Sequence, residues 1–78
     1  MPTIFRIGPY RFFFWANDRS EGVHVHVERE NMIAKFWVDP IRLQESGGFN
    51  RNELLKIQKI VEENANRILE AWNEYFNG

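Results

Sequence analysis

The stretch over residues 22–40 constrains the fold most, because its first part alternates strictly between apolar and polar residues. The apolar positions are Val23, Val25 and Val27, and the polar positions between them are His24, His26 and Glu28. Successive side chains of a β-strand point to opposite faces of a sheet, so the valines share one face and the polar residues share the other. The stretch therefore predicts a strand that buries one face and carries its chemistry on the other.

Strand-like patterns flank this stretch on both sides. The expected strands cover residues 3–7, 10–16, 23–29, 32–38 and, as a short edge strand, 41–45. Gly8 and Pro9 favour a tight turn after the first strand, and Asn31 can accept the positive φ that a two-residue hairpin turn requires. The polar segment 17–22 is expected to be a loop, with Asn17 and Asp18 as turn formers. Two antiparallel hairpins with an edge strand predict a sheet of four or five strands.

After residue 50 the apolar residues recur at every third or fourth position. The stripe consists of Leu54, Ile57, Val61, Ala65, Ile68, Trp72 and either Tyr75 or Phe76. This spacing is typical of one face of an α-helix, and Asn50 with Glu53 three residues later resembles a capping box. The continuous stripe favours a single long helix. Weak helix propensity at residues 63–66 leaves a kink or a division into two helices as the alternative.

These patterns predict a single domain of the α+β class over residues 1–78. An antiparallel sheet of four or five strands occupies residues 1–49, and a long C-terminal helix, kinked or not, occupies residues 50–78 and packs on one face of the sheet. The valines of the alternating strand, with Ala34, Phe36 and Val38 from the next strand, are expected to face the helix.

The other face of the sheet is expected to meet water or a partner, since one helix covers only one side. It would carry His24, His26, Glu28, Lys35, Trp37 and Asp39, joined from the second strand by Arg11, Phe13 and Trp15. We call this surface the histidine face. An exposed aromatic patch commonly marks an interaction site. The histidine face is therefore the expected working surface.

The composition narrows the class of function. The chain has no cysteine, which excludes disulfides, thiolate zinc sites and thiol catalysis. Its formal net charge is -1 and its charges are interspersed, so overall charge gives no argument for nucleic acid. The chain does not begin with a basic region and an apolar run, and no apolar segment approaches the ~20 residues that span a bilayer. We expect a cytoplasmic protein without a membrane partner.

Two histidines that alternate on one strand can share a metal ion, with Glu28 or Asp39 as a third ligand. No second histidine cluster exists to complete such a site, and histidines packed on a half-exposed strand are commoner than ligands. From the sequence we therefore expect no metal and no cofactor.

Two functions remain open on the histidine face. The first is a protein-interaction module whose binding residues are Arg11, Phe13, Trp15, Glu28, Lys35 and Trp37, with the aromatic and arginine side chains as anchors. The second is a metal-independent ribonuclease or RNA-binding protein, in which His24 or His26 acts as general acid or base and aromatic rings stack on bases. The residues leave open whether the chain is an enzyme. Ser20 and Ser46 lie in polar loops and give no support to serine nucleophile chemistry.

Several segments together resemble a family of small bacterial proteins, domain of unknown function four-one-six-zero. They are Met1–Ile4, Tyr10–Trp15, His24–Glu28, Ala34–Trp37 and Leu69–Trp72. The resemblance spans the whole chain and implies a protein partner encoded by a neighbouring gene, in a pair of the toxin–antitoxin type; self-association is the other option. Family members often carry prolines before the first histidine, where this chain has Glu21, Gly22 and Val23. The family has no established catalytic residues to transfer.

Overall fold

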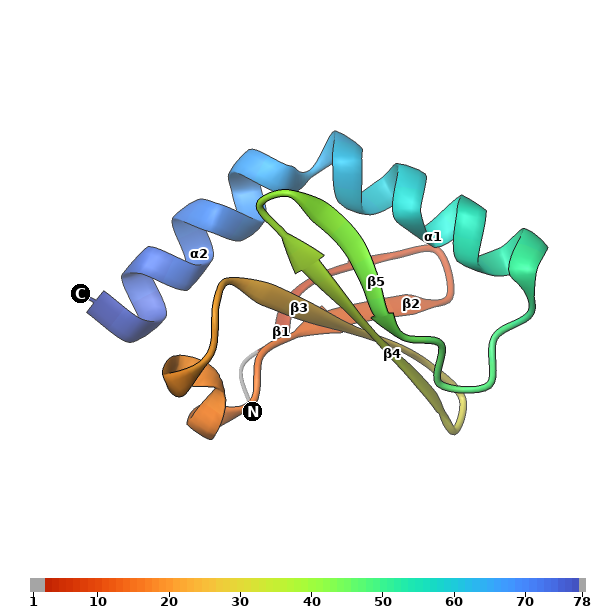
Figure 1. Cartoon of the computed structure of the whole chain (residues 1–78), viewed down its shortest axis with the longest axis horizontal. Helices are drawn as coiled ribbons and strands as arrows, with labels where there is room; N and C mark the ends of the chain where they lie inside the picture. Colours follow the sequence, from red (N-terminus) through yellow and green to blue (C-terminus); the bar gives the residue numbers. More distant parts are fainter. Residues whose placement is uncertain (1–2, 78) are drawn as a thin grey trace.

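The computed structural model describes residues 3–77, which form an antiparallel sheet of five strands and two helices (Figure 1). The strands are β1 (Thr3–Ile7), β2 (Tyr10–Phe13), β3 (His24–Arg29), β4 (Met32–Val38) and β5 (Ile41–Glu45). Each strand pairs with the next along the chain, so the sheet order is β1-β2-β3-β4-β5. The expected α+β class and the edge strand are confirmed.

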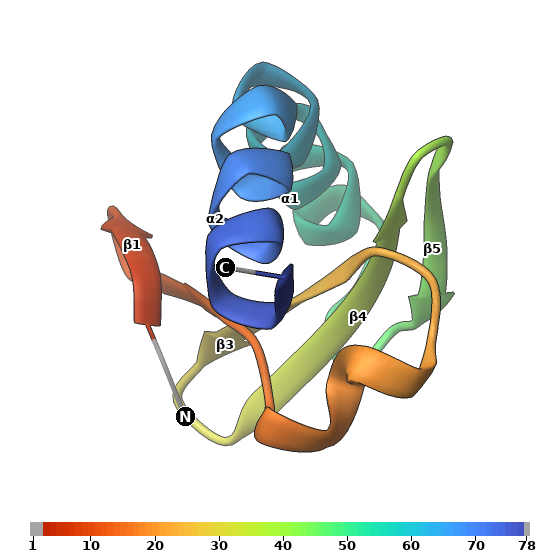
Figure 2. The ribbon, with the colours of Figure 1, turned by 90° about the vertical axis from the view of Figure 1, so that its left-hand side faces the viewer.

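Two helices, α1 (Arg51–Glu63) and α2 (Ala65–Asn77), cover one face of the sheet (Figure 2). The expectation of one continuous helix is wrong, and the alternative of two helices is correct. The break lies at Asn64, whose side-chain amide donates to the carbonyl oxygen of Ile60 at 2.8 Å. Asparagine side chains compete in this way with helical backbone bonds, which explains the break. The apolar stripe continues across it, so both helices bury the same side.

The core lies between the helices and the sheet. It comprises Phe5, Tyr10, Phe12, Phe14, Val25, Val27, Ala34, Phe36, Val38, Phe49, Ile57, Val61, Ile68, Trp72 and Phe76. The strand residues expected to face the helix, apart from the half-buried Val23, are therefore confirmed as buried. At the end of the stripe Phe76 is buried and Tyr75 is exposed. Neither helix of residues 3–77 is both long and apolar enough to cross a membrane.

Local conformation differs from expectation at two turns. In the β3–β4 hairpin the residue with positive φ is Glu30, at 57°, whereas Asn31 was expected to fill that role. After β2 the strand ends at Phe13 instead of residue 16, and the supposed loop contains a 3-10 helix, η1 (Ala16–Ser20). The early end of β2 turns the chain back beneath the sheet, and this path builds the site described below.

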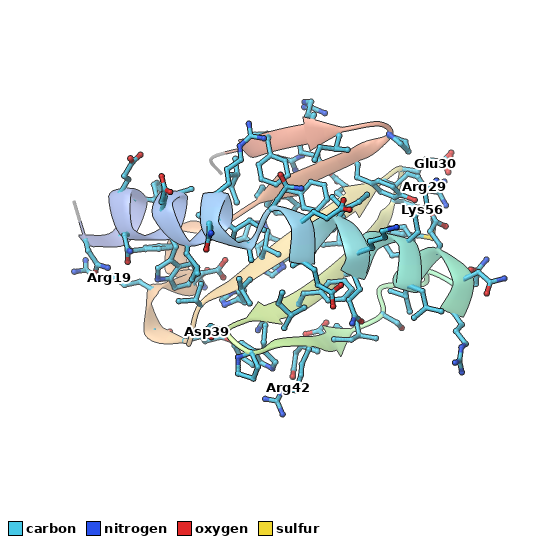
Figure 3. The ribbon with its side chains drawn as sticks, turned by 90° about the horizontal axis from the view of Figure 1, so that it is seen from above. Arg19, Arg29, Glu30, Asp39, Arg42 and Lys56 are labelled. Carbon is cyan, nitrogen blue, oxygen red and sulfur yellow. The ribbon has the colours of Figure 1, made fainter. Side chains whose placement is uncertain are left out.

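A charged cluster ties α1 to the sheet. The Asn50 side chain accepts from the backbone N–H of Glu53 at 2.9 Å, which confirms the N-cap. The Glu53 carboxylate does not bond back to Asn50, so the expected capping box is incomplete. The carboxylate accepts two hydrogen bonds from Arg29, at 2.6 and 2.7 Å, and one from Tyr10 at 2.8 Å. Seen from the helix side, Arg29 and Glu30 lie beside α1 at one end of the molecule (Figure 3). The helix is thereby anchored to β2 and β3.

Candidate functional site

One end of the histidine face is covered by the segment that follows β2. The side chains of Phe13 and His24 have no exposed surface and His26 retains 4%, so none of these residues forms an exposed patch. The expectation that they line a bare surface is wrong. The 3-10 helix η1 lies on the side of the sheet away from α1 (Figure 2), and its Asp18 lies against both histidines. The Trp15 ring lies against Phe13 and His26, and Trp72 of α2 packs against His24. Trp15 remains 36% exposed at the edge of this cover.

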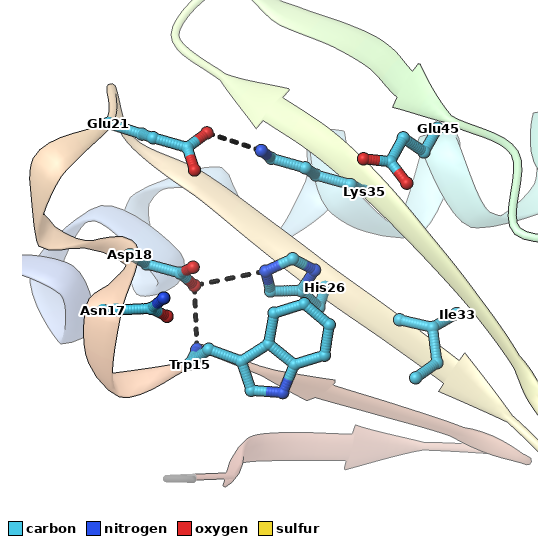
Figure 4. A pocket seen from close by; sticks show the side chains of 8 residues that line it. All are labelled: Trp15, Asn17, Asp18, Glu21, His26, Ile33, Lys35 and Glu45. Atoms are coloured by element: carbon cyan, nitrogen blue, oxygen red, sulfur yellow. Dashed lines mark hydrogen bonds and ion pairs between the residues drawn. The ribbon is translucent and has the colours of Figure 1, made fainter.

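Asp18 organises η1 and turns its carboxylate towards β3. Its Oδ2 accepts a hydrogen bond from the backbone N–H of Trp15 at 2.8 Å, and its own N–H donates to the Trp15 carbonyl at 3.0 Å. This reciprocal pair resembles a capping box. The same Oδ2 lies 3.2 Å from Nε2 of His26, which donates to it (Figure 4). The Asp18 side chain is only 5% exposed, so its carboxylate meets the two histidine rings in place of water.

His24 is fixed by a backbone contact. Its Nδ1 donates to the carbonyl oxygen of Gly22 at 2.8 Å, since a carbonyl only accepts. Its Nε2 lies 3.1 Å from Oδ2 of Asp18, but the approach does not have hydrogen-bond geometry. The ring packs edge-on against Trp37 and Trp72, at centroid distances of 5.6 and 5.3 Å. His24 is thus wedged between β4 and α2.

His26 lies among aromatic rings. Its ring stacks on Phe13 at a centroid distance of 5.4 Å and tilts against Trp15 at 4.1 Å. Burial lowers the pKa of His26 from its ordinary value of 6.5, an effect that the nearby Asp18 carboxylate opposes. His26 is therefore mainly neutral at neutral pH, with one ring nitrogen available as an acceptor or a ligand.

Beside His26 the face is hollowed, with a volume of about 470 Å³ (Figure 4). The hollow is lined by Trp15, Asn17, Asp18, Glu21, His26, Ile33, Lys35 and Glu45. Lys35 donates to the Glu21 carboxylate, which lowers the pKa of Glu21. The lining carries three carboxylates and one ammonium group. Its charge balance is therefore negative.

The remaining expected site residues form contacts with neighbouring side chains. Arg11 donates to Glu28 at 2.8 Å and places its guanidinium over the Phe13 ring, 4.1 Å from the centroid. Trp37 donates from its indole nitrogen to Gln44 at 2.8 Å. The structure brings Trp15, His26 and Lys35 together around the hollow.

The carboxylate nearest the histidines is Asp18, and neither Glu28 nor Asp39 joins them as a third ligand. Within residues 3–77, ligand atoms of Asp18, His24 and His26 all lie within 4.8 Å of one another. Glu28 is bound to Arg11, and Asp39 is exposed after β4. From the sequence, Asp18 was expected to be a turn former only. Its position three residues after the end of an aromatic run indicates a cap, but no sequence signal indicates that the capping carboxylate points at β3.

Residues 10–73 match the model of the family described as Domain of unknown function (DUF4160). This match covers most of the chain, including every strand except β1 and the whole of the Asp18, His24 and His26 cluster. Comparisons with curated proteins and with solved structures find no match.

Proposed function

The chain belongs to the DUF4160 family, whose function is unknown, and from its own geometry we propose that it is a protein-interaction module. The bound element would be a segment of a partner protein that rests on Trp15 and extends a lysine or arginine side chain into the hollow. The observation that carries this proposal is the exposed Trp15 at the rim of a negatively charged hollow.

The charge of the hollow favours a basic side chain. The Glu21 carboxylate is paired with Lys35, whereas Glu45 has no ion-pair partner among the described residues and projects towards the same space (Figure 4). A cation that enters would meet Glu45 directly, and the Trp15 indole supplies an apolar and π surface beside it. Exposed tryptophans next to charged groups are frequent anchors of protein interfaces.

RNA cleavage has less support from the same site. A phosphate group would enter a hollow with three carboxylates against one ammonium group, which repels it. Both histidines are nearly or fully buried, so neither reaches a phosphodiester without displacement of η1. Arg11, a cation on the same face that could attract a phosphate group, is bound to Glu28.

The partner class that we propose is the product of a gene adjacent to that of this chain, in a bacterial pair of the toxin–antitoxin type. The family resemblance suggests this class, and the geometry adds that the contacting segment should be basic. Self-association is a weaker alternative, because the hollow is acidic and a second copy would have to present a cationic segment to it.

The test is co-purification with the adjacent gene product. We expect Trp15→Glu and Glu45→Lys to weaken binding about tenfold or more, because each removes an anchor at an exposed position. Glu70→Lys is the matched control, since it makes the same charge change at an exposed position of α2 and should bind normally. Failure of the native chain to bind, or equal binding by Glu45→Lys, would contradict the proposal.

A further inference from the structure

One buried nitrogen beneath η1 has no hydrogen-bond partner. Nε2 belongs to the His24 side chain, which has no exposed surface, and residues 3–77 offer it no hydrogen bond. Because Nδ1 of the same ring donates to the Gly22 carbonyl, neutral His24 presents a lone pair at Nε2. Buried polar atoms are nearly always satisfied, so an orphan of this kind requires an explanation.

The groups around this lone pair converge. Oδ2 of Asp18 lies 3.1 Å from Nε2 of His24 and 3.2 Å from Nε2 of His26. In a hydrogen bond the acceptor lies along the N–H direction, whereas neighbouring ligands of a metal ion lie side by side because each points at the ion. Asp18 and His24 are close without hydrogen-bond geometry, which matches the second arrangement.

We infer that Asp18, His24 and His26 form a binding site for a divalent first-row transition-metal ion of the Zn²⁺ type. Two imidazole nitrogens and one carboxylate oxygen are a donor set that such ions prefer. Bonds of about 2.0–2.2 Å to one ion bring adjacent ligand atoms to roughly 3 Å from each other. Oδ2 of Asp18 lies 3.1 and 3.2 Å from the two nitrogens, and all three ligand atoms lie within 4.8 Å of one another. The bond from His24 Nδ1 to a backbone carbonyl is the outer contact that commonly orients a metal-binding imidazole.

The protons and the access path are consistent with such a site. Nε2 of His26 donates to Asp18 in the described structure, so its proton must leave when an ion binds. Transfer of that proton to Nδ1 of the same ring keeps the imidazole neutral. Three protein ligands leave a coordination position for water or another ligand. Because Asp18 and His26 also line the hollow, the ion can enter through it.

The chain has only two histidines, so their ring nitrogens can be followed individually by ¹⁵N NMR in untagged, metal-free protein. We expect one equivalent of Zn²⁺ to shift Nε2 of both rings, while Nδ1 of His24 stays protonated. Mg²⁺ should shift neither, because it prefers oxygen ligands. The isolated chain suffices for this titration, so its outcome does not depend on the proposed partner.

A carboxylate variant with a matched control completes the test. Asp18→Asn should weaken Zn²⁺ binding by more than about 100-fold, since loss of a direct ligand exceeds the cost of losing an outer contact. Glu45→Gln removes another carboxylate from the same hollow and should bind Zn²⁺ normally. Unshifted imidazoles in excess Zn²⁺, a shift of one ring only, or full affinity in Asp18→Asn would each overturn the inference. The native titration decides the matter even if the variant fails to fold.

Discussion

The two faces of the sheet are buried by different means. The helix face packs against a continuous apolar stripe from α1 and α2, and its strand residues are valine, phenylalanine, alanine and tyrosine. On the other face Trp15 and the short 3-10 helix η1 lie against His26, Trp15 also lies against Phe13, and Trp72 of α2 packs against His24. A hollow lined mainly by polar residues lies beside them. Burial is nearly complete at both places, yet among the described residues only the second encloses a carboxylate and imidazoles. The comparison shows that a short irregular segment, together with aromatic side chains from other elements, can bury the polar groups of a strand.

A carboxylate near the start of a helical segment ties each cover to the sheet. Glu53 of α1 accepts from Arg29 and Tyr10 at the rim of the helix face. Asp18 of η1 faces two imidazoles and is almost completely buried. The Glu53 carboxylate neutralises the Arg29 guanidinium, which can also reach water. The buried Asp18 carboxylate depends on its protein partners alone. Three substitutions, two of them at these carboxylates, test the contrast between the two faces.

The largest effect is expected on the helix face. Phe36→Ala removes a fully buried ring from the middle of β4 and should destabilise the fold by about 3–5 kcal/mol, from lost burial and the cavity left behind. Urea denaturation followed by circular dichroism measures the change. Leu55→Ala, at a side chain 53% exposed on α1, is the control and should change stability by less than about 0.5 kcal/mol. A cost at Phe36 as small as the control's would mean that this face is loosely packed.

On the histidine face the cost should be smaller and local. Asp18→Ala removes the acceptor for the Trp15 N–H and the His26 ring, and loss of buried partners of this kind costs about 1–3 kcal/mol. Hydrogen exchange should accelerate at residues 15–21 while amides of β3 and β4 stay protected, because η1 can open without the core. Uniformly faster exchange throughout the sheet would show that the two faces are one cooperative unit.

The alternation and the apolar stripe were sufficient to predict most of the fold. Val25, Val27, Ala34 and Phe36 face the helices because period-two and period-3.6 patterns record burial directly. The helix break at Asn64 was foreseen only as an alternative, because propensity gives a weak signal there. The position of the break depends on one side-chain hydrogen bond from Asn64 to Ile60, and the spacing of apolar residues gives no information about such a bond.

The candidate site was predicted only in part. His24 and His26 were identified with the correct shared face, but their burial was missed. Asp18 lies in a segment that reads as a polar loop, and Trp72, which packs on His24, was expected only as part of the apolar stripe. Asp18 has an ordinary turn-forming identity, and its role follows from the path that the chain takes after Phe13. Alternation predicts which way a strand residue points, and it carries no information about which other segments pack over that residue.

The smallest of the three effects, and one that depends on pH, is expected at Glu53. The hydrogen bonds from Arg29 lower the pKa of Glu53 below its ordinary value of 4.5. A carboxyl group with a lowered pKa in the folded state stabilises the fold fully above the ordinary value, and this contribution is lost as the pH falls through the lowered one. Glu53→Gln keeps an acceptor for Tyr10 and removes the charge. It should therefore be less stable than the native chain at neutral pH.

The pH dependence of that difference tests the contrast between the two covers. Urea denaturation of both proteins at neutral pH and at successive values below 4.5 should show the gap closing with acid, because the native Glu53 becomes protonated and then resembles glutamine. Glu70→Gln, at an exposed position of α2, controls for the loss of one negative charge and should stay within about 0.5 kcal/mol of the native protein at neutral pH. A gap that stays constant through the acid range would assign the role of Glu53 to packing instead of charge. Glu53 would then stabilise the fold by packing, as the core residues do. Of the two carboxylates, only Asp18 would hold its helical segment to the sheet by charge.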